Sequence, residues 1–212
     1  DKDKARIKLE LNKFRSDLSK IKFHIILTDR IWIRDSGPLF LINNKKGKKI
    51  ILNFRFNGWS KYNDYQKDNK INTKIAKLIK IKKIEPKIKV KKNLKKIILE
   101  GGAIDVNGQG SILLTRECLL SKVQQRNPGV NKLNLENAFR KYLNLKNFIW
   151  LNKGIKGDDT HGHIDDIARF VSPNTIMAAI EKNKKDRNFK NLNENLKILK
   201  KSNNTNGKKF RI

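Results

Sequence analysis

Apolar residues recur at helical spacing in four parts of the chain. In residues 4–20 the apolar positions Ile7, Leu11, Phe14 and Leu18 lie three or four residues apart, which predicts an amphipathic helix. Three further stretches show a comparable pattern and are also predicted as helices: 69–80, 134–145 and 191–201.

Short apolar runs bounded by turn residues lie between these helices, a pattern typical of strands in a folded protein. The predicted strands are 23–27, 39–43, 48–54, 95–100, 111–115, 147–151, 168–171, 175–180 and 208–212. Short polar turns predict hairpins at 44–47, 107–110 and 172–174. The order helix, strand, acidic loop and hairpin recurs about every 60–70 residues, which indicates an α/β fold of repeated units.

Length and composition limit the class of protein. The 212 residues fit one large domain or two small ones and are enough for a buried core. No apolar run approaches the ~20 residues of a membrane span, and the charged start is no signal peptide. The single cysteine, Cys118, excludes an internal disulfide, so we expect a cytoplasmic protein. The chain starts inside a helix and stops inside a strand, so we expect a fragment.

The charge of the chain raises a different possibility. Fifty Lys and Arg residues against twenty Asp and Glu give a formal net charge of +30, which is typical of nucleic-acid-binding proteins. The best candidate for a basic patch is Lys77–Lys96, but it lacks the aromatic residues of a single-strand binding platform. The lysines are spread over the whole chain among Asn and Ile, as in proteins from AT-rich genomes. Nucleic-acid binding therefore stays an alternative.

Four loops combine acids, glycines and aromatic residues directly beside strand-like runs. We name them the Asp35 loop (28–38, "TDRIWIRDSGP"), the Trp59 loop (53–62, "NFRFNGWSKY"), the Glu100 loop (99–110, "LEGGAIDVNGQG") and the His163 loop (157–170, "GDDTHGHIDDIARF"). Binding groups concentrate on loops held by a rigid scaffold, so four such loops suggest one shared site.

Each loop also has a purely structural interpretation. Asp35 before Ser-Gly-Pro can be a turn residue that bonds to its own backbone. Glu100 can end a strand, although the two glycines after it would leave its carboxylate uncovered. Trp32 and Trp59 can be core residues. The His163 loop can be a solvated acidic loop or a metal site, but it lacks a zinc spacing such as H-E-x-x-H and a nearby cysteine, so we expect no metal.

The functional interpretation of these loops is more specific. In an extended segment His163 and Asp165 would point the same way. A histidine near neutrality can act as acid and then as base, and carboxylates match the paired donors of a guanidinium. A site made of Asp35, Glu100, His163 and Asp165 would hold a guanidinium and move protons around its carbon. It lacks a nucleophile.

These motifs resemble those of a known family. "DRIWIRDSGP", "FRFNGW", "LEGGAIDVNGQGSILLTRECLL" with a following "RNP", and "GDDTHGHIDDIARFVSPNTI" occur in the order found in the agmatine deiminases, which are grouped with Porphyromonas-type peptidylarginine deiminases. The resemblance implies a pentein fold, a five-bladed α/β propeller. Residues 1–212 would be a single partial catalytic domain with roughly three of the repeated units.

The resemblance also implies an activity. Agmatine would be hydrolysed to N-carbamoylputrescine and ammonia, on a route to putrescine, through a covalent amidino-cysteine intermediate and without cofactors. The substrate would be a small cationic guanidino compound, the full-length protein could be a homo-oligomer, and no membrane or nucleic-acid partner is implied. A protein-arginine deiminase of the same family is the alternative.

Roles for individual residues follow from the resemblance as well. Asp35 and Asp165 would bind the guanidinium nitrogens, Glu100 and His163 would transfer protons, and Trp32 and Trp59 would line the pocket. The family's nucleophile lies in a "GGGNIHC"-type motif near the C-terminus that this chain lacks. Cys118, between Glu117 and Leu119, matches a different family cysteine and is expected to be a buried, unreactive thiol. At His161 the family more often has Asn or a similar residue, and the resemblance implies that this position is close enough to the site to affect substrate placement.

Overall fold

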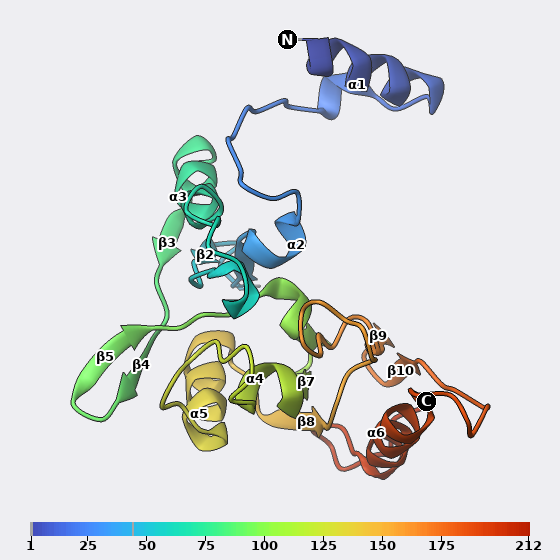
Figure 1. Ribbon diagram of the computed structural model, residues 1–212. Coiled ribbons are helices and arrows are strands. Elements are labelled where there is room, and N and C mark those ends of the chain that lie inside the picture. Colours follow the sequence, from blue (N-terminus) through green and yellow to red (C-terminus); the bar gives the residue numbers. More distant parts are fainter. Residues whose placement is uncertain (1, 44) are drawn as a thin grey trace.

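The computed structural model describes residues 2–43 and 45–212, and three α/β units with a common topology follow one another in it (Figure 1). In the first unit β1 (Leu39–Ile42) and β2 (Lys49–Leu52) form an antiparallel hairpin. Helix α3 (Asp68–Leu78) follows, and β3 (Lys82–Ile84) returns parallel to β2. The sheet order is therefore β1-β2-β3.

The second unit repeats this topology. Strands β6 (Asp105–Val106) and β7 (Ser111–Thr115) are antiparallel, and β8 (Asn147–Leu151) pairs parallel to β7 after the helices α4 (Arg116–Leu120) and α5 (Lys132–Leu143). An additional hairpin of β4 (Lys87–Val90) and β5 (Asn93–Lys96) precedes it. We predicted the turn at 107–110 but not the β4–β5 hairpin, whose exposed positions are mostly lysines.

The third unit is completed by two isolated bridges. Strands β9 (Ala168–Ser172) and β10 (Thr175–Ala178) are antiparallel, and α6 (Phe189–Lys201) follows them. The chain then returns so that Arg211 pairs parallel with Thr175 and Lys209 pairs with Asn203. The predicted strand at 208–212 is thus limited to single bridges.

The core lies on both faces of the β6-β7-β8 sheet. Because side chains alternate along a strand, Ile112 and Leu114 of β7 join the cluster that contains Leu135 and Phe139 of α5. Leu113 points the other way into a second cluster, which includes Leu192 and Leu199 of α6. All five residues of β7 are buried for this reason, as expected for a central strand covered by helices on two sides.

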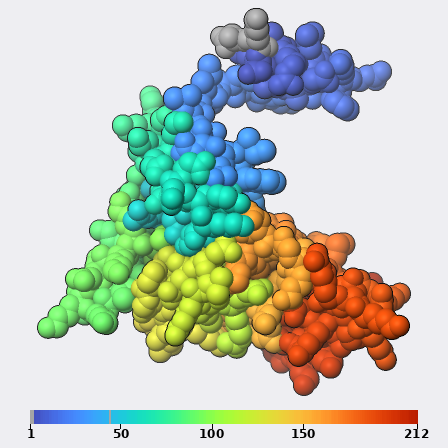
Figure 2. Space-filling model, in the orientation of Figure 1, coloured from blue at the N-terminus to red at the C-terminus, as the bar shows by residue number. Residues whose placement is uncertain are grey.

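The N-terminal segment differs from the sequence-based expectation. The helix predicted over 4–20 is α1 (Lys2–Lys13) only, because Arg15 takes a left-handed φ of 52° and a short 3-10 helix η1 (Leu18–Lys20) follows. Residues 21–28 are extended but belong to no strand, so the strand predicted at 23–27 is wrong in this structure. No strand of the described residues pairs with its backbone, since α1 and the segment after it lie apart from the other units (Figures 1 and 2).

The remaining predictions agree with the structure to within a few residues. The helices predicted at 69–80, 134–145 and 191–201 are α3, α5 and α6, and the hairpins at 39–54 and 168–180 are present. The strand predicted at 95–100 forms only in part: β5 ends at Lys96, and Ile98 then makes one parallel bridge with Arg55. No helix in the described part of the chain is long and apolar enough to cross a membrane.

Candidate active site

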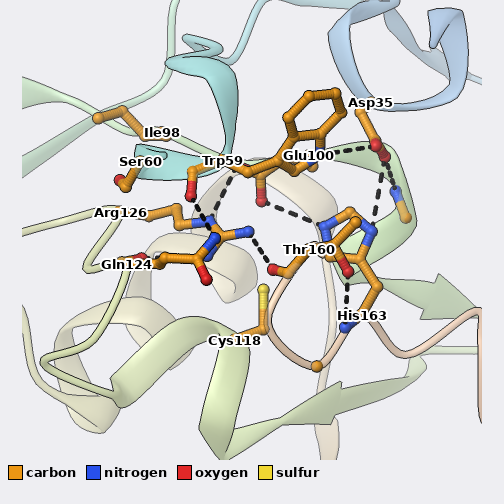
Figure 3. Close-up of polar contacts among 12 residues, drawn as sticks. Asp35, Trp59, Ser60, Ile98, Glu100, Cys118, Gln124, Arg126, Thr160 and His163 are labelled. Carbon is orange, nitrogen blue, oxygen red and sulfur yellow. Dashed lines mark hydrogen bonds and ion pairs between the residues drawn. The ribbon is translucent and has the colours of Figure 1, made fainter. Parts of the chain in front are cut away.

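Four short elements bring the predicted loops together around one pocket. They are the one-turn helix α2 (Ile33–Ser36), the 3-10 helices η2 (Gly58–Ser60) and η3 (Gly101–Ala103), and the turns of the His163 loop. The pocket has a volume of about 550 Å³. Its walls include five of the six predicted site residues: Trp32, Asp35, Trp59, His163 and Asp165. The sixth, Glu100, lies under this wall (Figure 3).

Backbone contacts place these elements next to one another. The Arg55 backbone N–H donates to Ile97 at 2.9 Å and the Arg55 carbonyl accepts from Leu99 at 3.1 Å, so the Trp59 and Glu100 loops start side by side. The carboxylate of Asp68 in α3 accepts from the backbone N–H of Asp29 at 2.9 Å. This contact anchors the start of the Asp35 loop on the first α/β unit.

Asp35 is held by two hydrogen bonds. Its Oδ2 accepts from the indole Nε1–H of Trp59 at 2.9 Å, and its Oδ1 accepts from the backbone N–H of Gly102 at 2.9 Å. Burial raises the pKa of Asp35, and the nearby His163 charge and the two hydrogen bonds reduce this rise without cancelling it. The carboxylate is therefore fixed in direction, as a binding group requires.

The two glycines after Glu100 have a different role from the one expected. A Cβ at Gly101 would lie 2.1 Å from the Arg34 carbonyl oxygen, and a Cβ at Gly102 would lie 2.5 Å from Nδ1 of His163 and 2.7 Å from Oδ1 of Asp35. The glycines thus let three loops approach closely. They do not uncover Glu100, which is 0% exposed, so that expectation is wrong.

Glu100 forms a buried ion pair with Arg126. The Nε–H of Arg126 donates to Oε1 of Glu100 at 3.2 Å, and both side chains are completely buried. The other guanidinium nitrogens donate to the carbonyl oxygens of Gln124 and Thr160 (Figure 3). Burial alone would raise the pKa of Glu100, but contact with His163 and the charge of Arg126 outweigh it and hold the pKa below its ordinary value. Glu100 is therefore a carboxylate at neutral pH.

His163 stands between three carboxylates. Its Nε2 lies 3.6 Å from Oε2 of Glu100, and its Nδ1 lies 3.8 Å from both Oδ1 of Asp35 and Oδ1 of Asp165. Burial opposes protonation of the ring, but Cys118, Glu100 and Asp35 together raise the pKa of His163 to about 11. The ring is consequently an imidazolium at neutral pH, with one nitrogen toward the pocket carboxylates and the other toward Glu100.

Asp158 folds the loop that presents His163. Its Oδ2 accepts from the backbone N–H groups of Gly162 at 2.6 Å and His163 at 3.2 Å, and its Oδ1 accepts from Thr160 at 2.7 Å. The backbone N–H of Asp165 donates to the Gly102 carbonyl at 3.3 Å, which ties this loop to η3. His163 and Asp165 therefore face one pocket, as the sequence predicted, but through tight turns and not through an extended strand.

The two tryptophans differ in burial. Trp59 is 4% exposed and takes a left-handed φ of 58° in η2, with an edge-to-face contact to Phe56 at 5.0 Å between ring centroids. Trp32 is 58% exposed at the pocket mouth. Tyr62 bridges two loops there, because its hydroxyl donates to Asp159 at 2.7 Å.

Several residues of the site were not identified from the sequence. Arg126 belongs to the "RNP" motif, for which the sequence predicted no role, and a lone arginine before Asn-Pro carries no signal that it is buried. The sequence predicted no specific role for Asp158, although its position two residues before Thr160 is typical of an Asx turn. The expectation that His161 could affect substrate placement is wrong in this structure, because its Nε2 lies 3.2 Å from the Ser121 hydroxyl and the residue lines a separate pocket.

Cys118 lies close to the catalytic candidates but under them. It is 1% exposed, and burial raises the pKa of its thiol, as expected for an unreactive cysteine. Its sulfur and ligand atoms of Glu100 and His163 all lie within 4.8 Å of one another, so these three side chains are the group in residues 2–43 and 45–212 that could hold a metal. Our expectation that the protein uses no metal cofactor stays a prediction.

The site can bind a planar cation and move a proton beside it. Two carboxylates, Asp35 and Asp165, face the pocket and can each accept hydrogen bonds from paired N–H donors. His163 adjoins both of them and carries a proton. Glu100 keeps the ring charged from the far side.

Proteins with similar sequences are named as agmatine deiminases. A Legionella pneumophila (strain Paris) protein named as a candidate agmatine deiminase is 36% identical over 182 residues, which are 85% of this chain and 49% of that protein. A Latilactobacillus sakei protein of the same name is 35% identical over 186 residues, 85% of this chain and 48% of that protein. The chain spans about half the length of the curated relatives it matches.

Solved structures agree with the fold over a similar part. The agmatine deiminase of Enterococcus faecalis superposes with a TM-score of 0.77 at 27% identity, over 88% of this chain and 49% of that chain. A substrate-bound cysteine-to-serine variant of the C. jejuni agmatine deiminase gives 0.76 at 34% identity, over 94% of this chain and 55% of that chain. The mixed α/β arrangement is thus shared with these enzymes. Because the family model for Porphyromonas-type peptidyl-arginine deiminases also matches residues 2–212, the chain belongs to that family.

Proposed function

We propose that the protein containing this chain is an agmatine deiminase, which hydrolyses agmatine to N-carbamoylputrescine and ammonia. The observation that carries this proposal is the position of the buried His163 ring next to both Asp35 and Asp165. The names of the relatives and of the superposed structures support it.

The substrate guanidinium would lie between Asp35 and Asp165 in the pocket. Each carboxylate can accept two parallel N–H bonds from a guanidinium, a geometry that an ammonium lacks. The Trp59 bond and the Gly102 bond to Asp35 hold one of these acceptors in place before substrate arrives. Trp32 and Trp59 would flank the bound group.

His163 would act first as an acid. Its ring carries a proton at neutral pH and can deliver it to the nitrogen that leaves as ammonia. The neutral ring that remains can then take a proton from the water that resolves the amidino-cysteine. Glu100 would help the ring to regain its proton, because its carboxylate stays ionised 3.6 Å from Nε2 and stabilises the imidazolium.

The attacking thiolate would come from a part of the whole protein outside these 212 residues. Cys118 is unsuited to the task because it is buried and its thiol pKa is raised. The substrate-bound C. jejuni enzyme is a cysteine-to-serine variant, which fits a cysteine nucleophile in that relative. We propose that the whole protein forms a five-bladed pentein propeller, of which residues 1–212 supply roughly three units of one catalytic domain.

The test is an assay of ammonia release from agmatine by the full-length protein. We expect the wild type to release ammonia, and we expect His163→Asn and Asp165→Asn to lose this turnover while they keep the fold. Absence of turnover in the full-length protein, despite a cysteine outside this chain, would refute the proposal.

The family model is named for peptidyl-arginine deiminases, so protein arginine is the second candidate substrate. Parallel assays with agmatine and with a peptide that ends in arginine separate the two, because only the preferred substrate retains a high kcat/KM. Nucleic-acid binding, the alternative suggested by the charge of +30, predicts an affinity that falls steeply with salt yet persists at physiological salt.

A further inference from the structure

Three side chains that can coordinate a metal ion lie close together on the Nε2 side of the His163 ring, opposite the nitrogen that faces Asp35 and Asp165. Sγ of Cys118 and ligand atoms of Glu100 and His163 lie within 4.8 Å of one another, and all three residues are buried. The Thr115 hydroxyl accepts from the Cys118 backbone N–H at 3.1 Å and thereby fixes the start of α4. The sulfur lies near the His163–Glu100 pair (Figure 3).

Within residues 2–43 and 45–212, two atoms of this cluster have no hydrogen-bond partner. Oε2 of Glu100 and Nε2 of His163 are buried and face each other at 3.6 Å, beyond hydrogen-bond length. Buried polar atoms without a partner are rare in native proteins and costly, so each needs an explanation. A ligand that both atoms and the sulfur could share would satisfy them together.

The donor set is that of a zinc site. Zinc is bound by Cys sulfur at about 2.3 Å, His nitrogen at about 2.0–2.1 Å and carboxylate oxygen at about 2.0–2.2 Å, in tetrahedral geometry. Such bonds put the donors roughly 3.3–3.6 Å apart. The Glu100–His163 separation of 3.6 Å already fits this range, and the sulfur, within 4.8 Å of both ligand atoms, would have to approach each by about 1.2 Å or less.

The surroundings also fit a bound metal. Histidines that ligate a metal usually present the other ring nitrogen to a carboxylate. Nδ1 of His163 lies 3.8 Å from the carboxylates of Asp35 and Asp165. Arg126 holds the second oxygen of Glu100, which orients the ligating oxygen toward the cluster.

We propose that Glu100, Cys118 and His163 form an inhibitory zinc site at the inner wall of the pocket. Zinc would reach it past His163, the member of the cluster that lines the pocket. The ion would replace the thiol proton of Cys118 and a ring proton of His163, both of which leave to solvent. One zinc ion and two protons carry the same charge, so the net charge of the buried cluster is unchanged.

Bound zinc would stop turnover because it takes the place of the proton on Nε2 of His163, so the ring is no longer the imidazolium that donates a proton in our proposed mechanism. This consequence rests on the proposed function, whereas zinc binding itself does not. The two parts therefore have separate tests.

Binding is tested by equilibrium dialysis of the full-length protein against zinc, followed by metal analysis. The wild type is expected to hold one zinc ion per chain at this site. Cys118→Ala is expected to lower the affinity at least about 100-fold, because a lost ligand weakens a site more than a lost outer partner does. His161→Ala is the matched control, since that histidine lies outside the cluster and should leave zinc binding unchanged.

The identity of the sulfur ligand is tested with cobalt in place of zinc. A thiolate-to-cobalt charge-transfer band is expected in the wild type and should disappear in Cys118→Ala. If that variant does not fold, Cys118→Ser serves in its place, because a hydroxyl of similar size is a much weaker ligand. A band that persists in either folded variant, or a wild type that binds no zinc, would overturn the proposal.

Inhibition is measured relative to the uninhibited rate of each variant. Zinc should inhibit the wild type and act on Cys118→Ala only at concentrations about 100-fold higher. Equal inhibition of both would place the ion on the nucleophilic thiol instead, and the proposed site would be wrong. If the protein has no deiminase activity, dialysis and the cobalt spectrum still decide whether the zinc site exists.

Discussion

Gly102→Ala tests whether close approach at η3 organises the site. The added Cβ would lie 2.5 Å from Nδ1 of His163, 2.7 Å from Oδ1 of Asp35 and 3.0 Å from Oδ1 of Asp165. Ordinary contact starts at 3.4 Å, so His163 has to move by about 0.9 Å. A misplacement of about 1 Å can cost ~100-fold in rate, or about 2.7 kcal/mol of transition-state stabilisation.

The assay compares kcat/KM for agmatine between the full-length wild type and Gly102→Ala. We expect a fall of ~100-fold, together with a loss of about 1–3 kcal/mol in the free energy of unfolding from overpacking. The control is Gly108→Ala, at a turn where φ is +72° and no atom of the described residues lies within 4 Å of the added Cβ. It should lose about 1–2 kcal/mol of stability through backbone strain and keep full activity per folded molecule. Wild-type kcat/KM in Gly102→Ala would refute the reasoning.

Three further predictions concern charge and hydrogen bonding at the site. Arg126→Met leaves the buried Glu100 carboxylate without its partner, so urea denaturation should show a loss of about 3–5 kcal/mol in the free energy of unfolding. Trp59→Phe keeps an aromatic ring but deletes the N–H group that donates to Asp35, and a hydrogen bond to a charged group contributes about 1.5–3 kcal/mol. Because this bond holds Asp35 in place for the substrate, KM for agmatine should rise roughly 10- to 100-fold. The pKa of His163 lies near 11, so ring ¹⁵N shifts should report two protonated nitrogens from about pH 6 to pH 9.

The sign of the His163 effect on stability follows from its raised pKa. A histidine whose pKa is higher in the folded state stabilises the fold fully below its ordinary value of 6.5 and loses this contribution as the pH rises to about 11. A neutral His163 ring at pH 8 would contradict the ion-pair description.

For Arg126→Met the matched control is Arg140→Met, which breaks a half-exposed ion pair with Glu136 on helix α5 and should lower the free energy of unfolding by no more than about 1 kcal/mol.

The sequence alone determined the local elements and the chemical character of the loops. Apolar spacing in 134–145 and short apolar runs on both sides of the turn at 172–174 act over a few residues, so they predict α5 and the β9–β10 hairpin without knowledge of the rest of the chain. The motif residues Asp35, Glu100, His163 and Asp165 were identified from their side-chain types, which suit a guanidinium, and from their positions in loops beside predicted strands.

Tertiary structure decided where those residues stand and what supports them. The hydrogen bond between Asp35 and Gly102 joins residues that are 67 positions apart in the sequence, and the Glu100–Arg126 pair joins residues 26 positions apart. No local sequence pattern can therefore predict these contacts. The strand expected at 23–27 failed for the related reason that a strand needs a neighbour, which periodicity cannot supply. Burial of Glu100 and the proximity of Cys118 to His163 arise only when separate segments pack together, because burial is a property of the assembled fold.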